Sequence, residues 1–218
     1  LRRADLERIT AAVSEAEART SAEIVTVVAS QSGSYTGQVL LVCLAAMAAY
    51  SVLYFVFMGF VQKFLALFLW HVHPVNLLFV FVSGQVLFFG LAFGLLSFFP
   101  RLRRGVVSGK DRNARVRLRA ESAFYRYNVT ATGAGNGLLL YISLFERRVE
   151  LLVDSGIAAR VKNETWQDVV DGIVSGIREG RFVPAVESAV ARCGAVLAGP
   201  FPRRQGDVNE LPDKPVVE

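Results

Sequence analysis

Two apolar stretches near the middle of the chain decide how the rest of it folds. They are QVLLVCLAAMAAYSVLYFVFMGF (Gln38–Phe60) and VNLLFVFVSGQVLFFGLAFGLLSFF (Val75–Phe99). An α-helix rises about 1.5 Å per residue, so about 20 apolar residues cross the roughly 30 Å hydrocarbon layer of a bilayer. Between Ile24 and Pro100 the single Asp, Glu, Lys or Arg is Lys63. The stretches therefore predict a transmembrane helical hairpin at residues 38–100, with its interfacial turn at Val61–Pro74.

Basic residues cluster directly after the second stretch, in a juxtamembrane linker at residues 101–111. Its cations are Arg101, Arg103, Arg104 and Lys110. Cytoplasmic loops of membrane proteins carry an excess of Lys and Arg, and two spans return the chain to the side it left. We therefore expect a multi-pass inner-membrane protein with both soluble flanks in the cytoplasm. Much of the net charge of +5 lies beside the membrane, so we assign it to anionic lipid headgroups and expect no nucleic-acid partner.

The two flanks alternate helical and strand patterns. Helical apolar spacing appears at residues 1–19, 116–127, 166–177 and 182–197, and buried-strand patterns appear at 22–29, 138–144 and 149–154. Because the hairpin returns the chain near its point of departure, both flanks can pack together. The sequence predicts one discontinuous α/β domain, residues 1–37 with 112–202, followed by a flexible tail at 203–218 that is rich in Pro and charge.

This order of elements resembles the TPM domain family. The matching segments are TSAEIVTVVA (Thr20–Ala29), GNGLLLYISLFERRVELLVDSGI (Gly135–Ile157) and IREGRFVPAVESAV (Ile177–Val190). The family's hairpin combines an NGVLL-like strand, a charged turn with Arg and a second strand ending near Gly, and Asn136, Gly137, Arg147 and Gly156 fit it. The resemblance implies a three-layer α/β/α domain around a mixed sheet, interrupted here by the transmembrane hairpin.

The resemblance also implies an enzymatic alternative, because some family members are described as acid phosphatases or metal binders. Their acidic residues lie near the start of the first hairpin strand, where this chain has Gly133–Gly137 without a carboxylate. Hard cations prefer several oxygen ligands. Asn136 and Asp154 are the candidate ligands for a divalent cation, so a metal-dependent phosphatase is the alternative and no cofactor is required by the main interpretation.

Three further candidates have plain structural alternatives. Glu146, Arg147 and Arg148 form either the solvated tip of the strand hairpin or a contact with a protein partner. Gly90 and Gly94 form a GxxxG pattern that packs either within the hairpin or between two copies of the chain. His71 and His73 have the spacing of a metal pair, but interfacial packing is the simpler interpretation.

The main functional hypothesis is a membrane-anchored, non-enzymatic module. It binds another membrane protein or a complex and contributes to its assembly, maintenance or regulation. Its expected partners are membrane lipid and a membrane protein, with homo-oligomerisation as an option through the second span.

Overall fold

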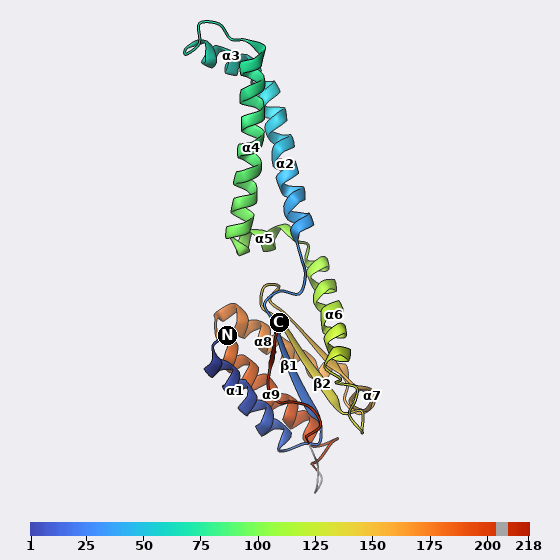
Figure 1. Ribbon diagram of the computed structural model, residues 1–218. Coiled ribbons are helices and arrows are strands. Elements are labelled where there is room, and N and C mark those ends of the chain that lie inside the picture. The colour runs from blue at the N-terminus through green and yellow to red at the C-terminus, as the bar shows by residue number, and fades with distance from the viewer. Residues whose placement is uncertain (204–208) are drawn as a thin grey trace. The chain divides into compact units, whose positions relative to one another are not determined.

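The computed structural model describes residues 1–203 and 209–218 and divides the chain into two compact units (Figure 1). One unit consists of Leu1–Gly33 and Gly109–Glu218, and the other is Ser34–Ser108. The first is the α/β domain and the second contains the two long apolar helices.

The α/β domain is built on a four-stranded mixed sheet with the order β3-β2-β1-β4. The strands are β1 (Glu23–Ala29), β2 (Gly137–Ser143), β3 (Arg148–Val153) and β4 (Val216–Val217). Strand β1 runs parallel to β2 and to β4, whereas β2 and β3 form an antiparallel hairpin. Both central strands are buried along their whole length, as expected for a sheet covered on both faces.

Helices cover both faces of this sheet. The helices of the domain are α1 (Arg3–Glu17), α6 (Gly109–Arg126), α7 (Ser155–Ala158), α8 (Gln167–Glu179) and α9 (Phe182–Ala198), with a 3-10 turn at Asn163–Trp166. Ile24 and Val28 of β1 pack in one core with α1, α8 and α9. Val25 and Val27 point to the opposite face and pack with Val116 and Phe124 of α6. The predicted three-layer α/β/α fold is confirmed.

The second unit contains α2 (Thr36–Val56), α3 (Met58–Ala66), α4 (Pro74–Phe98) and α5 (Pro100–Val106). Helices α2 and α4 have 21 and 25 residues with mean hydropathies of 2.4 and 2.1, so both are long and apolar enough to cross a membrane. The first ends at Val56 rather than Phe60, and α3 begins inside the expected span. The linker predicted at 101–111 is largely helical, because α5 and the start of α6 occupy it.

The C-terminal segment differs from the predicted flexible tail. Residues 204–208 lie outside the described part of the chain, but Val216 and Val217 pair with Val27 and Val28 of β1. The main-chain N–H of Glu218 donates to the oxygen of Val28 at 3.0 Å. These backbone hydrogen bonds fix the end of the segment against the sheet, although two residues are too few to produce a strand pattern in the sequence.

Candidate functional site at the start of the central strands

Asn136 connects the beginnings of the two central strands. It lies in the loop before β2 and is only 6% exposed. Its main-chain N–H donates to the Thr132 hydroxyl at 3.0 Å, and its side-chain amide donates to the main-chain oxygen of Ser21, just before β1. The side-chain oxygen of Asn136 is buried without a hydrogen-bond partner. A buried polar atom without a partner is costly, so this oxygen is a candidate ligand atom.

The loop reaches this position because two glycines permit close backbone contacts. Gly135 has a φ of 62°, which side-chain-bearing residues rarely adopt. A Cβ at Gly137 would collide with the main-chain oxygen of Val129, so only glycine fits at the first residue of β2.

A cavity of about 310 Å³ lies at this end of the sheet, where β1 and β2 begin, and Asn136 is part of its lining. Two carboxylates share the lining: Glu23 from the first position of β1 and Glu210 from the C-terminal segment. Glu23 accepts hydrogen bonds from the main-chain N–H groups of Glu210 and Leu211, at 3.2 and 3.3 Å. Glu210 in turn accepts from the N–H of Gly133 at 3.0 Å.

Arg160 adds a positive charge to the same lining. Its guanidinium lies 4.7 Å from the centre of the Phe201 ring and donates to the oxygen of Pro200 at 2.9 Å. The cavity therefore combines a guanidinium, two carboxylates and a buried amide oxygen. The oxygens suit a hard divalent cation, although no group of three or more His, Cys, Asp or Glu side chains gathers anywhere in residues 1–203 and 209–218.

Asp154, the other candidate ligand, caps a short helix. Its carboxylate accepts from the main-chain N–H and the hydroxyl of Ser155, at 2.6 and 3.2 Å, at the start of α7. It is not part of the cavity lining that contains Asn136. Reasoning from the sequence did not identify Glu23 or Glu210. Glu23 pairs with Gly137 in the register of the two parallel strands, so aligning the first residues of these strands would have linked Glu23 to Asn136.

Glu146 is not at a solvated hairpin tip, and that expectation is wrong. The side chain is 2% exposed, and its carboxylate accepts from the main-chain N–H of Ser32 at 3.1 and 3.2 Å. The Ser143 hydroxyl also donates to it. The Ser32 hydroxyl donates to Ser143 at 2.8 Å and lies 3.2 Å from the Tyr141 hydroxyl. Ionic groups are buried only where hydrogen bonds replace water, and this network supplies them.

Arg147 and Arg148 follow Glu146 in the same turn and are less buried than it. Both side chains are half-buried, and Arg147 has a φ of 52°, the left-handed conformation of a tight turn. Arg148 begins β3 opposite Ser143. The two arginines can contact a partner, whereas Glu146 holds the turn in place.

The comparisons with known proteins agree with this fold. The TPM domain family model matches residues 106–196. The chain contains a TPM domain. In structure it is similar to the BA42 protein of the psychrophilic bacterium Bizionia argentinensis, determined by NMR, with a TM-score of 0.58 and 16% identity over 100% of this chain and 95% of that chain. No curated protein matches the sequence.

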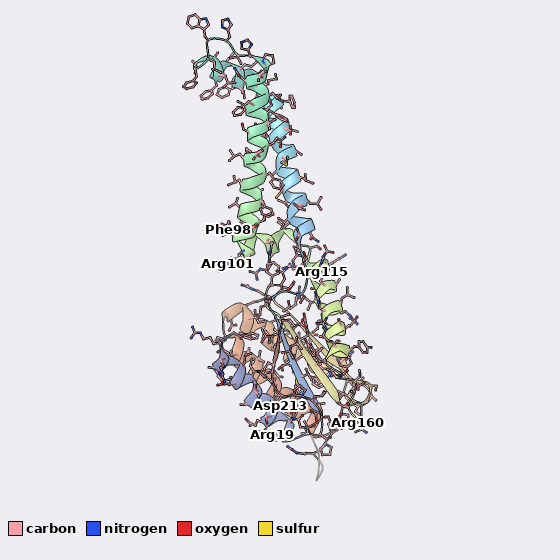
Figure 2. All side chains as sticks on the ribbon, in the orientation of Figure 1. Arg19, Phe98, Arg101, Arg115, Arg160 and Asp213 are labelled. Atoms are coloured by element: carbon pink, nitrogen blue, oxygen red, sulfur yellow. The ribbon has the colours of Figure 1, made fainter. Side chains whose placement is uncertain are left out.

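The four cations expected at lipid headgroups belong to two structural units. Arg101, Arg103 and Arg104 lie on α5 in the unit that carries the apolar helices, and Lys110 lies at the start of α6 in the TPM domain. Arg101 follows the apolar helix α4 closely, and Figure 2 labels it beside Phe98. Cations at the end of an apolar helix suit a headgroup layer.

The two long apolar helices do not pack through Gly90 and Gly94. A Cβ added at either position would meet nothing within 4 Å. The contact instead uses Gly84, where a Cβ would collide with the Tyr50 hydroxyl. That hydroxyl donates to the oxygen of Val80 at 3.0 Å. The interpretation that Gly90 and Gly94 pack within the hairpin is therefore wrong. The GxxxG pattern lies on a different face of α4 from Gly84.

Proposed function

We propose that this TPM domain is a membrane-anchored, non-enzymatic binding module that supports the assembly, maintenance or regulation of a membrane-protein complex. The observation that carries the proposal is the contact between Glu146 and Ser32. Ser32 belongs to the segment through which the chain passes from β1 toward the first apolar helix. Arg147 and Arg148 directly follow Glu146 in the same turn, so we propose that a partner binding them acts on the turn that holds this segment.

The membrane and the side of it on which the domain lies are inferred from the distribution of charge. We infer that α2 and α4 cross an inner membrane and that the TPM domain lies on the cytoplasmic side, because basic residues follow α4 on α5 and α6. Anionic headgroups are the expected lipid partners of Arg101, Arg103, Arg104 and Lys110. A cysteine placed at exposed Arg101 should resist an impermeant maleimide in intact cells and react after the cells are opened. Labelling in intact cells would reverse the orientation.

The partner-binding proposal is tested by charge reversal in the turn. Full-length protein carrying Arg147→Glu and Arg148→Glu is compared with wild type after gentle detergent extraction and affinity purification. We expect wild type to retain a membrane protein in near-stoichiometric amount and the double variant to lose it. Arg178→Glu, an exposed arginine in the last turn of α8, is the matched control. Retention in all three proteins, or purification of this chain alone, would contradict the proposal.

A metal-dependent phosphatase is the second candidate, and the unpaired side-chain oxygen of Asn136 beside Glu23 and Glu210 favours it. Those oxygens would hold a divalent cation, which would act as a Lewis acid on a phosphoryl oxygen of a phosphate ester. Hydrolysis of a phosphomonoester that requires Ca²⁺ or Mg²⁺ and disappears in Asn136→Ala would support it. Asp154→Ala separates the two predicted ligands, because a cap residue should affect stability rather than turnover.

A further inference from the structure

Strand β3 is an edge of the sheet, and its outer side is unpaired. In the order β3-β2-β1-β4 its one neighbour is β2. Successive residues of an antiparallel strand turn their main-chain groups alternately toward and away from that neighbour. The N–H of Asp154 donates to the oxygen of Gly137 on β2 at 2.8 Å. The main-chain groups of Val149, Leu151 and Val153 therefore point away from β2, and no hydrogen bond from residues 1–203 or 209–218 reaches them.

The strand lacks two common devices that prevent an edge from pairing. An unpaired row of N–H and C=O groups is a template for another strand unless Pro, a bulge or charged side chains interfere. Strand β3 has six residues without Pro, and its register with β2 is continuous from Leu138–Val153 to Ser143–Arg148. The charged side chains of this edge therefore decide what it accepts.

Three charged side chains lie along one face of the strand. Side chains alternate between the two faces, and Leu152 packs in the core on the α6 side, so Arg148, Glu150 and Asp154 share that side. All three are half-buried, and none of them forms an ion pair within the described part of the chain. Within one copy Arg148 and Asp154 are about 20 Å apart along the extended strand, too far to pair. A partly desolvated charge without a partner is costly.

A second copy of the same strand supplies the missing partners. Antiparallel pairing centred on Leu151 puts Leu151 opposite its counterpart and Val149 opposite Val153 of the second copy. Each of these pairs exchanges two main-chain hydrogen bonds. In this register Arg148 lies directly opposite Asp154 of the second copy, and two-fold symmetry repeats the contact.

Other registers are disfavoured by charge or by overlap. A shift of two residues in one direction puts Glu150 opposite Glu150 of the second copy, and in the other direction it puts Glu150 opposite Asp154. Like charges directly opposite each other are destabilising. A shift of four residues pairs Arg148 with Glu150 but leaves Val153 outside the second strand. A slip of one residue opposes outward main-chain groups to inward ones.

We propose that two copies of this chain form a symmetric dimer through β3, with the strands antiparallel around Leu151 and Arg148 of each copy paired with Asp154 of the other. The two sheets then become one continuous sheet. Glu150 lies opposite Leu152 of the second copy and keeps the attraction of Arg117 on its own α6. The dimer requires no other protein, so it goes beyond the proposed function.

The test measures the mass of the purified full chain in detergent by sedimentation. We expect wild type to be a dimer. Arg148→Asp and Asp154→Arg should each be monomeric at the same concentration, because two like-charged pairs then face each other, with a dissociation constant at least about tenfold higher. Arg178→Asp, at an exposed position in the last turn of α8, is the matched control and should remain a dimer.

Mixing the two charge variants identifies the contact. In a pair of one Arg148→Asp copy and one Asp154→Arg copy, the two substituted side chains face each other with opposite charge, and so do the two native ones. The mixture should therefore dimerise although neither variant does so alone. A monomeric wild type, a dimer that survives both substitutions, or a mixture of the two folded variants that stays monomeric would overturn the proposal. No partner is present, so the result is independent of whether Arg147 and Arg148 bind another protein.

A disulfide at the two-fold axis gives an independent measurement if Asp154→Arg, which removes the cap of α7, does not fold. Opposite Cα atoms in a hydrogen-bonded pair are about 5.5 Å apart, within the range of about 4.4–6.8 Å that a disulfide spans. Leu151→Cys is made with buried Cys43 and Cys193 replaced by alanine. On mild oxidation it should form linked dimers several-fold faster than Glu164→Cys, an exposed control. Equal rates would overturn the dimer.

Discussion

The main-chain N–H of Ser32 lies 3.1 and 3.2 Å from the two carboxylate oxygens of Glu146, so both oxygens accept from one donor. The residues are 114 positions apart, and the two apolar helices lie between them in the sequence. Arg119 of α6 adds a hydrogen bond to the oxygen of Ser32 at 3.3 Å. The segment leaving β1 is therefore held by a strand hairpin and by a helix that both follow the insertion.

Glu146→Ala should destabilise the TPM domain by about 2–4 kcal/mol, because the buried N–H of Ser32 and the hydroxyl of Ser143 lose their acceptor. Trp166 is buried in the domain core and Trp70 is 96% exposed, so Trp70→Phe leaves a fluorescence reporter for domain unfolding by guanidinium. Arg147→Ala in the same turn should cost less than about 1 kcal/mol. Equal losses in both variants would contradict the role given to Glu146.

Gly137→Ala should also destabilise the domain, by about 1–3 kcal/mol, because the added methyl group collides with the main-chain oxygen of Val129 and backbone must move. Gly133→Ala in the same loop is the control. Its Cβ would lie 3.5 Å from a carboxylate oxygen of Glu210, an ordinary contact. Guanidinium unfolding followed by Trp166 fluorescence should separate the two variants. Similar midpoints would show that the loop can adjust at Gly137.

The sequence predicted the layers of the domain but not its polar contacts. Strands β1 and β2 are nearly continuous apolar runs that are buried along their whole length, as expected for a sheet covered on both faces. Glu146 precedes two arginines in a turn, a pattern typical of a solvated tip, and its partner Ser32 is remote in the sequence.

The same limit applies to helix packing and to the candidate site. A GxxxG pattern shows that α4 can approach a neighbour closely but not which of its faces does so. Gly84 lacks a second glycine at that spacing, and its importance follows from the position of Tyr50 on the other helix. Glu210 joins Asn136 only because the C-terminal segment returns to the sheet, which a segment rich in Pro and charge does not predict.

Gly84→Val should lower the stability of the apolar hairpin by about 1–3 kcal/mol, because the side chain must displace the Tyr50 ring. The expected readout is a lower melting temperature of the full chain in detergent. Gly90→Val adds the same volume where nothing lies within 4 Å and should leave the melting temperature nearly unchanged. Tyr50→Leu should partly rescue Gly84→Val; a loss that stays the same would place the effect elsewhere.

Cys193 should be inert in the folded domain. It is fully buried on α9, and burial raises the pKa of its thiol to about 12, so almost no thiolate exists at pH 8. In a Cys43→Ala background, a maleimide should label less than about a tenth of the protein in the time that labels the guanidinium-unfolded chain completely. Rapid labelling of the folded protein would show that α9 opens readily.

The stability of the whole domain should fall as pH rises from about 4.5 to 8. The raised pKa of Glu17, about 8, means that the folded state holds a proton which the unfolded chain has released in this range. The slope is at most about 1.4 kcal/mol per pH unit, and solvent screening at a partly exposed side chain reduces it. Guanidinium unfolding at pH 5, 6.5 and 8 measures the slope, and Glu17→Gln should remove it while raising stability most at pH 8. If Glu17→Gln instead lowers stability equally at all three values, the carboxyl contributes only through its hydrogen bond to Ile24.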